Sequence, residues 1–356
     1  MNTTLTSILI VVLAVSFLAE WIVIKAAYKL RLFDKPNTRK IHHNFIPRLG
    51  GCIILPVLVL GLFLGYSLDQ DAFLQLFKGS ETSLVGLLMA AGVVYIFGFF
   101  DDLVNIRYRN KFVAQILSGL SMCLCGLFID SLHGFLWMDN LPVVLSWIVT
   151  VFSVVYISNA INFIDGIDGL AGSLGVIALI YYGVVFHMMG CPGFVMVCVL
   201  ILIALVALLH FNLFGKVESK TKVFMGDAGS LSLGVLLCGL GVYVLQRAEL
   251  AGSSSANFIL AVAPLMLPSF DVVRVVMVRK LNGKNVFMAD KSHIHHKLLA
   301  MGLSQSQTLI CLIFIDLVMV VTAVCMMTVI NVNLVILIEV IMFTILVLMI
   351  NRKMKK

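Results

Sequence analysis

Residues 193–212 read GFVMVCVLILIALVALLHFN, a stretch without Asp, Glu, Lys or Arg. About 20 apolar residues in a helix match the thickness of the hydrocarbon core of a membrane. Ten further segments of this kind lie near residues 4–24, 50–68, 84–103, 112–129, 142–159, 169–188, 230–246, 257–279, 309–329 and 331–350. The sequence therefore predicts an all-α, polytopic integral membrane protein with about 11 transmembrane helices, folded as a single domain over residues 1–356.

The composition of the chain excludes several other classes of protein. Of its 356 residues, 61% are hydrophobic and 12% are charged, against about 45–50% and about 25% in soluble globular proteins. An ordinary water-soluble enzyme, a disordered segment, a DNA-binding module and a secreted disulfide scaffold are therefore excluded. None of the eight cysteines forms a C-x-x-C pair, so their spacing indicates neither a zinc site nor a disulfide framework.

The distribution of basic residues predicts the orientation of the helices. With the N-terminus outside, 23 of the 25 Lys and Arg fall in inner segments, which are residues 25–48, 107–111, 216–222, 274–297 and 352–356. Loops rich in Lys and Arg stay on the cytoplasmic side of a membrane. The sequence therefore predicts the N-terminus outside and the C-terminus inside. The net charge of +7 then reflects topology and anionic ligands and not nucleic acid.

The inner loops also contain most of the polar residues that could carry chemistry. They lie near residues 25–49, 101–112, 159–172, 213–230 and 280–308, and we expect the active site there. Polar groups gathered on one face favour an enzyme, because a transporter also places them at the midplane of the membrane.

Four charged residues inside or at the end of the later spans remain open to several interpretations. Asp316 and Glu339 fall inside spans, and Asp271 and Arg274 lie near the end of the ninth. Ionisable residues in a membrane are functional hypotheses by default. Asp271 and Arg274, three residues apart, could equally form an internal ion pair.

The first polar motif is the pair Asp101-Asp102 at the inner end of the third span. A helix C-terminus disfavours a carboxylate by about 0.3–1 kcal/mol, and the two neighbouring charges repel each other. Alternatively, both carboxylates could simply be solvated at the end of the helix. A site that binds a cation, or that raises the pKa of one carboxylate, explains the pair better. Lys111 and two arginines follow within reach.

The second motif places a polar residue at every third position, at Asn159, Asn162, Asp165 and Asp168. On a helix such positions lie near one face. Capping of the next helix needs only one Asp, and the spacing does not match an EF-hand loop. The four residues therefore indicate a binding site.

The third motif, KVFMGDAGS at residues 222–230, contains Asp227 at the start of the eighth span. Asp227 could cap this helix. The glycines and the lysine equally suit a metal-bound diphosphate beside backbone N–H groups. The Gly-x-Gly-Asp motif of intramembrane aspartyl proteases is disfavoured because position 224 is Phe.

Two further inner segments contain candidate ligands. His293, His295 and His296 do not have the spacing of a helical zinc site and, beside two lysines, suit a phosphate or a sugar; a solvated loop is the alternative. The first inner loop contains Lys40, His42 and Arg48, which topology alone would explain and which could also attract a lipid phosphate.

Together these residues resemble the ligand set of Mg²⁺, which binds one or two carboxylates, phosphate oxygens and several waters. Cations and glycines suit a diphosphate, and the apolar remainder suits a lipid. These residues therefore predict a metal-dependent enzyme that joins or cleaves a phosphate ester at the inner surface of the membrane.

At these motifs the sequence resembles the polyprenyl-phosphate N-acetylhexosamine-1-phosphate transferase family. The resemblance runs from about residue 30 to residue 300, and its motifs are FFDD, NAINFIDGIDG, FMGDAGS and HIHH, which end at residues 102, 169, 230 and 296. The HIHH form is similar to the branch that initiates O-antigen, enterobacterial common antigen or teichoic acid linkage.

The resemblance implies an activity, a cofactor and a location. A sugar-1-phosphate, of which GlcNAc-1-phosphate is the first choice, would pass from a UDP-N-acetylhexosamine to undecaprenyl phosphate with release of UMP. The cofactor would be Mg²⁺, with Mn²⁺ as the alternative. The enzyme would lie among the lipids of the bacterial cytoplasmic membrane, with its site on the cytoplasmic face, and a homodimer is compatible with the family.

The resemblance also implies roles for individual residues. Asp227 would bind the metal with Asn162 close by, and Asp101 or Asp102 would act on the lipid phosphate. The remaining candidates would bind substrate, and they are Lys111, Asn159, Asp165, Asp168, His293, His295 and His296, with Lys40, His42 and Arg48 as weaker assignments.

Several alternatives stay open at this point. A UDP-MurNAc-pentapeptide phosphotransferase of peptidoglycan synthesis belongs to the same superfamily, but Ser292 before the histidines and Lys297 after them argue against it. A membrane transporter and a catalytically silent scaffold are the non-enzymatic alternatives. The lipid phosphate could attack the β-phosphorus directly, or an Asp could first form a covalent phosphosugar-enzyme.

Overall fold

The computed structural model describes residues 2–34, 45–247, 254–283 and 292–354. In this part of the chain nearly all regular structure is helical, since a helix satisfies its own backbone hydrogen bonds in a membrane. The α-helices are α1 (Asn2–Leu30), α2 (Ile54–Leu68), α3 (Gln70–Leu76), α4 (Glu81–Val104), α5 (Tyr108–Leu124), α6 (Val143–Ile164), α7 (Leu170–Met188), α8 (Pro192–Phe214), α9 (Gly226–Arg247), α10 (Ser254–Val262), α11 (Met266–Leu281), α12 (Ile294–Ala300), α13 (Gln305–Met326) and α14 (Val332–Met354).

Short elements connect these helices. Strand β1 (Phe33–Asp34) pairs antiparallel with β2 (Ile46–Pro47). The 3-10 helices are η1 (Gly50–Ile53), η2 (Phe135–Trp137) and η3 (Ala263–Leu265). The fold is therefore all-α apart from one two-residue strand pair.

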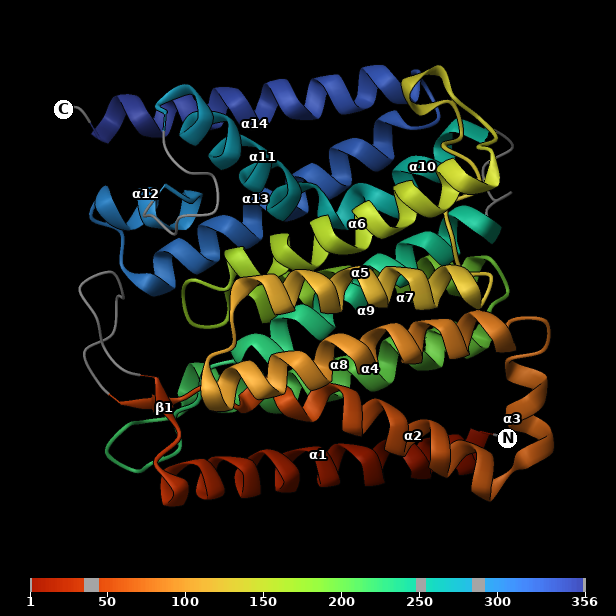
Figure 1. Ribbon diagram of the computed structural model, residues 1–356, viewed down its shortest axis with the longest axis vertical. Coiled ribbons are helices and arrows are strands. Elements are labelled where there is room, and N and C mark those ends of the chain that lie inside the picture. Colours follow the sequence, from red (N-terminus) through yellow and green to blue (C-terminus); the bar gives the residue numbers. More distant parts are fainter. Residues whose placement is uncertain (1, 35–44, 248–253, 284–291, 355–356) are drawn as a thin grey trace.

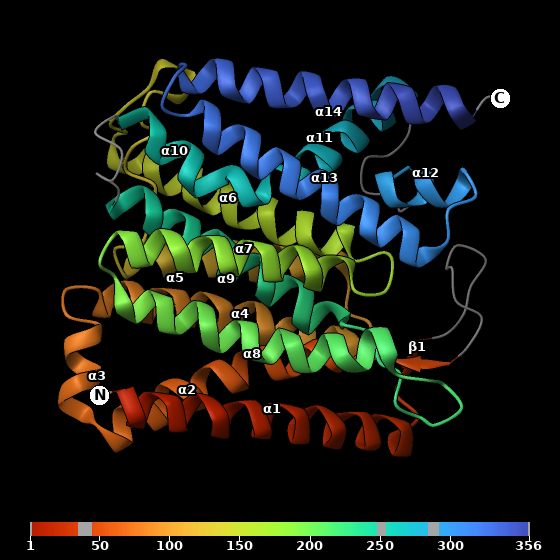
Figure 2. The same ribbon diagram turned by 180° about the vertical axis from the view of Figure 1, so that it is seen from behind.

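The long helices run side by side from one end of the molecule to the other (Figures 1 and 2). One end of the bundle carries β1, α12 and the C-terminus, and we call it the α12 face. The opposite end carries α3 and the N-terminus, and we call it the α3 face. The two termini thus lie at opposite ends of the helices.

Within the described residues, ten helical segments are long and apolar enough to cross a membrane. The segment expected at 112–129 is α5, which has 17 residues and ends at Leu124. It is therefore shorter than the other spans, at the lower limit for a transmembrane helix. The span expected at 257–279 is interrupted, because Pro264 lies in η3 between α10 and α11 and a proline cannot donate the helical hydrogen bond.

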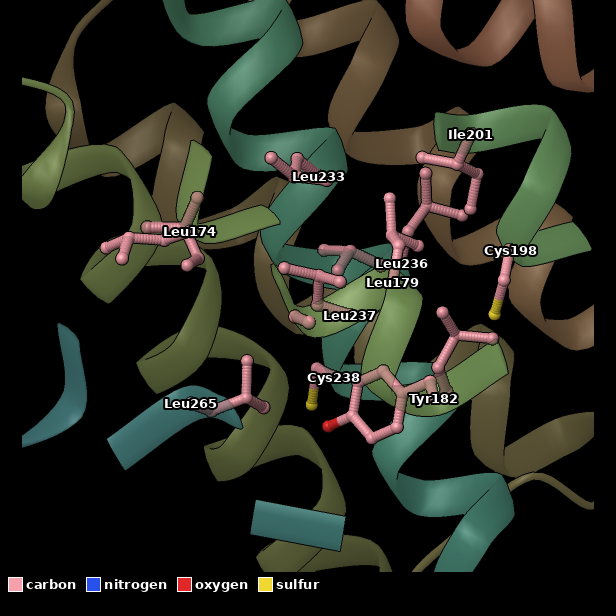
Figure 3. Packing of buried hydrophobic residues seen from close by; sticks show 14 of the residues in the cluster. Leu174, Leu179, Tyr182, Cys198, Ile201, Leu233, Leu236, Leu237, Cys238 and Leu265 are labelled. Carbon is pink, nitrogen blue, oxygen red and sulfur yellow. The ribbon is translucent and has the colours of Figure 1, made fainter. Parts of the chain in front are cut away.

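Helix α9 lies at the centre of the bundle. Every residue from Ala228 to Leu245 is buried, whereas the outer helices expose apolar side chains as lipid-facing helices do. Figure 3 shows Leu236 of α9 packed among side chains of α7 and α8, including Leu174 and Ile201. A helix surrounded by protein on all sides can hold a polar group at its end away from lipid.

Glycine allows α4 to approach the start of α9 closely. A Cβ atom built on Gly98 would lie 2.7 Å from the Cα of Ala228 and 2.8 Å from the carbonyl oxygen of Asp227. Both are backbone atoms, so a side chain at position 98 would have to push the two helices apart.

We therefore expect Gly98→Ala to destabilise the protein by about 1–3 kcal/mol, the usual cost of overpacking. The matched control is Gly92→Ala on the same helix, where a Cβ atom would meet nothing within 4 Å. Thermal unfolding in detergent should show a lower midpoint for Gly98→Ala and an unchanged or higher midpoint for Gly92→Ala. Equal midpoints would contradict the close contact between α4 and α9.

Candidate functional site

The first turn of α9 begins at a position that only glycine fits. Gly226 has φ +75, and a Cβ atom there would lie 1.8 Å from the carbonyl oxygen of Arg48. The segment before α9 pairs with the end of the first inner loop, since Phe224 donates to the carbonyl of Pro47 (2.8 Å) and Gly51 donates to that of Met225 (2.8 Å). These bonds hold the start of α9 against the first inner loop.

Asp102 binds the free backbone N–H groups of α9. Its Oδ1 accepts the N–H of Asp227 and its Oδ2 accepts the N–H of Ala228, both at 2.9 Å. The first N–H groups of a helix have no partner within the helix, and a carboxylate at this end also interacts favourably with the helix dipole. One carboxylate of the Asp101-Asp102 pair is thus used to anchor α9.

Asp101 and Asp227 share the ammonium group of Lys111. The Nζ of Lys111 lies 2.7 Å from Oδ2 of Asp101 and also pairs with Oδ2 of Asp227. Oδ1 of Asp101 accepts the N–H of Ile106 at 2.8 Å. The cation stabilises two carboxylates that would otherwise repel each other.

Asn162 completes this group from α6. Its Nδ2 donates to Oδ1 of Asp227 at 3.0 Å and to Oγ of Ser230 at 2.8 Å. We call Asp101, Asp102, Lys111, Asn162 and Asp227 the carboxylate cluster. It joins α4, α5, α6 and α9 at the α12 face of the bundle.

The loop between α6 and α7 adds two more carboxylates. Burial, together with the charges of Asp227 and Asp168, raises the pKa of Asp165 to about 7. Asp168 pairs with Nζ of Lys222 at 2.7 Å, and Lys222 also donates to the carbonyl of Asn212. From the sequence, Lys222 is only a lysine near the glycines of the third motif. Nothing in the spacing predicts its ion pair with Asp168.

The histidine segment packs on the same loop. The ring of His295 lies directly over Gly166, where a Cβ atom would be 2.1 Å from its Nε2. His295 is buried, and within the described part of the chain neither ring nitrogen has a hydrogen-bond partner. Burial and the neighbouring His296 and His293 lower its pKa to about 3, so the ring is neutral. The ring of His296 lies 4.2 Å away.

The other predicted site residues lie at different distances from the cluster. Asn159 bonds to neighbours outside the cluster, because its Nδ2 donates to Gln115 (2.9 Å) and to the carbonyl of Val155 (2.7 Å). Arg48 donates to Oδ1 of Asn105 at 3.4 Å, beside the exit of α4. Lys40 and His42 lie outside the described residues.

The described residues contain no group of three or more His, Cys, Asp or Glu side chains arranged around one metal position. Asp101 and Asp227 are nevertheless close enough to share one cation, as Lys111 shows. An incoming cation could therefore bind between these two carboxylates if Lys111 moved aside.

Comparison with known proteins identifies the proteins that this chain is similar to. A model of glycosyl transferase family 4 matches residues 84–245. The chain is 29% identical over 306 residues to the probable undecaprenyl-phosphate N-acetylglucosaminyl 1-phosphate transferase of Bacillus subtilis (strain 168), covering 85% of this chain and 79% of the relative. The undecaprenyl-phosphate alpha-N-acetylglucosaminyl 1-phosphate transferase of Yersinia pestis is 28% identical over 313 residues, with coverages of 87% and 80%.

These findings define a multi-pass membrane protein of the glycosyl transferase class, whose site is built from the ends of four helices. The matched region contains three of the four sequence motifs and all members of the carboxylate cluster. The family model and these relatives support the resemblance to the polyprenyl-phosphate N-acetylhexosamine-1-phosphate transferase family that the sequence motifs indicate.

The anchoring of α9 by Asp102 leads to a stability prediction. Asp102→Asn keeps the size of the side chain, but its amide can accept only one of the two N–H groups. We expect a loss of about 1–3 kcal/mol, the cost of leaving a buried donor without a partner, measured by thermal unfolding. In the control Asp69→Asn the side chain caps α3 through one bond, to the N–H of Ala72, which Asn makes equally well. An equal loss in both variants would argue against the anchor.

The raised pKa of Asp165 leads to a prediction about pH. Its pKa is about 7 in the folded protein and about 3.9 in an unfolded chain, so between these values the folded state binds more protons. The free energy of unfolding must therefore fall as the pH rises through this window.

Asp165→Asn cannot ionise, so the wild type should lose stability relative to this variant as the pH rises from about 4 to about 7. The measurement is the unfolding midpoint of both proteins in detergent with EDTA at several pH values. Two parallel curves would show that Asp165 ionises normally.

Proposed function

We propose that this protein transfers GlcNAc-1-phosphate from UDP-GlcNAc to undecaprenyl phosphate and releases UMP. The observation that carries the proposal is the carboxylate cluster, in which Asp101 and Asp227 from separate motifs share one cation. The names of the relatives give the acceptor and the sugar. In a bacterium this reaction would initiate synthesis of a surface polysaccharide.

Mg²⁺ is the metal that suits this donor set. It needs only one or two carboxylates when phosphate oxygens and waters supply the other ligands, so Asp227 and Asp101 are enough protein carboxylates for it. Asp227 would hold it, with Asp101 and Asn162 beside it. When bound, Mg²⁺ would neutralise charge on the diphosphate and on the departing UMP.

The geometry favours Asp101 over Asp102 as the group that acts on the lipid phosphate. Both oxygens of Asp102 are bound to the backbone of α9, whereas Oδ2 of Asp101 pairs with the side chain of Lys111 and Oδ1 accepts a backbone N–H. In direct attack, a phosphate oxygen of the lipid forms a bond to the β-phosphorus, and the bond from that phosphorus to the oxygen of UMP breaks. A proton still on the lipid phosphate passes to Asp101, and Lys111 stabilises the phosphate charge.

An apolar groove supports a lipid acceptor. It has a volume of about 680 Å³ and lies between α6, α9, α10, α11 and α14. Its walls are almost entirely hydrophobic, and Arg274 and Lys297 are among the lining residues, near the α12 face. A polyprenyl chain fits such walls while its anionic head stays at the face of the bundle that holds the cluster.

The α12 face is assigned to the cytoplasm. Lys111 and Lys222 of the site and Lys297 of α12 belong to the basic inner loops of the sequence, and such loops stay on the cytoplasmic side. The UDP-sugar would then reach the site from the compartment where nucleotide sugars are made. In a bacterium the membrane is the cytoplasmic membrane.

The test is a radiolabel transfer assay with detergent-purified protein, UDP-GlcNAc, undecaprenyl phosphate and Mg²⁺. We expect butanol-extractable label with an equal release of UMP, and no product with EDTA. Asp227→Asn should lower kcat by at least about 100-fold, as the loss of a group that stabilises transferred charge does. Glu339→Gln on α14 is the control, because Glu339 bonds to Thr322 (2.6 Å) and not to the cluster, and it should stay active.

Product from UDP-GalNAc or UDP-MurNAc-pentapeptide in place of UDP-GlcNAc would correct the identity of the sugar. Absence of product with every donor would overturn the proposed transferase activity. Omitting the lipid tests direct attack. Exchange of labelled UMP into UDP-GlcNAc without lipid would require a covalent phosphosugar-enzyme and would overturn direct attack.

A further inference from the structure

Asp271 is a fully buried carboxylate near the histidine segment, with an exposed fraction of 0%. Its Oδ1 accepts hydrogen bonds from Nε and Nη2 of Arg274, at 3.2 and 2.6 Å, and from the N–H of Ile294 at 3.1 Å. Its Oδ2 lies 2.8 Å from Nδ1 of His293. The expected ion pair with Arg274 is therefore present, but it is only part of a larger network.

Arg274 binds the same short segment from its other side. Its Nη2 donates to the carbonyl of Ser292 at 2.6 Å. Three consecutive residues, Ser292, His293 and Ile294, are thus bound by one ion pair on α11. We call Asp271 and Arg274 the α11 clamp.

The α11 clamp determines which nitrogen of His293 carries hydrogen. Arg is always protonated in proteins, and an ionised carboxylate can only accept hydrogen bonds. Because Asp271 is paired with Arg274, His293 must donate to it from Nδ1. The other ring nitrogen, Nε2, is then left for a ligand, as an acceptor in the neutral ring and as a donor in the protonated ring.

The ring that the clamp orients lies against the site. The centroid of His293 is 5.9 Å from that of Phe163, the residue after Asn162. His293 is also parallel to His295, with centroids 5.8 Å apart and planes at 10°, and His295 covers Gly166. The clamp therefore connects α11 to the loop that carries Asp165 and Asp168.

We propose that Asp271 is a positioning residue for His293, and that it fixes the ring so that Nε2 faces the diphosphate or sugar of the UDP-sugar. This inference rests on the proposed transfer reaction. A buried ion pair contributes little to stability compared with apolar residues of the same size. Its value here is orientation, since without the clamp neither the tautomer nor the direction of His293 is determined.

A double-mutant cycle separates positioning from general stability. Asp271→Asn and His293→Ala should each lower kcat/KM for UDP-GlcNAc, by about 10- to 100-fold for Asp271→Asn, the usual effect of removing a group that orients a histidine. The double variant should be no worse than His293→Ala, because the two residues act as one unit. The control is Asp316→Asn, the same change at another fully buried aspartate, on α13, which should keep wild-type kcat/KM.

A second variant guards against loss of folding. Asp271→Asn leaves Arg274 buried without its counter-charge, so Asp271→Asn/Arg274→Gln removes both charges together. It should fold and should show the same loss of kcat/KM. Additive losses in the cycle, or wild-type kcat/KM in Asp271→Asn or in Asp271→Asn/Arg274→Gln, would overturn the positioning role.

A spectroscopic measurement tests the clamp independently of the reaction. In protein labelled with ¹⁵N at histidine, the signal absent from His293→Ala identifies His293, and its shifts should show hydrogen on Nδ1. The tautomers should mix in Asp271→Asn/Arg274→Gln. An Nε2–H tautomer in the wild type would overturn the inference even if transfer is observed. Failure of transfer with the expected tautomer would instead refute the proposed reaction.

Discussion

The site depends on how the N-terminus of α9 is satisfied. This helix is enclosed by protein from Ala228 to Leu245, and its first N–H groups have no partner within the helix. Asp102 supplies two of the missing bonds and so fixes α4 to α9. Gly98 and Gly226 allow the backbones to come close enough for this contact. The position of Asp227 follows directly, because it is the residue whose own N–H is bound.

Charge balance holds the other groups around this anchor. Three aspartates lie within one cluster, and the ammonium of Lys111 offsets two of them while helix N–H groups stabilise the third. In the same way, Lys222 offsets the charge of Asp168, and Arg274 offsets the charge of Asp271. Burial, together with the charges of Asp227 and Asp168, raises the pKa of Asp165 to about 7, and no ion pair among the described residues offsets this.

Much of this could be predicted from the sequence, and the remainder required the fold. The apolar segments gave the class of protein and most of the spans, and the three-residue spacing from Asn159 to Asp168 gave the second motif. The spacing could not show that Asn159 faces Gln115, because a helical period fixes a face but not its neighbour. Nor could the spacing assign different roles to Asp101 and Asp102, because their roles depend on which carboxylate binds the N–H groups of α9. The contacts of Lys222 with Asp168 and of Asp271 with His293 join residues 54 and 22 positions apart, and nothing local encodes them.

The order of the cluster along the chain has a consequence for biosynthesis. Asp101, Asp102, Lys111, Asn162 and Asp227 all precede the end of α9 at Arg247, so every group of the cluster has been made before α10 emerges from the ribosome. The histidine segment and the aspartate that holds it come later, on α11 and α12. A nascent chain that ends after α9 therefore already contains the whole set of carboxylates and lacks the histidines, so assembly of the site is divided into an early and a late stage.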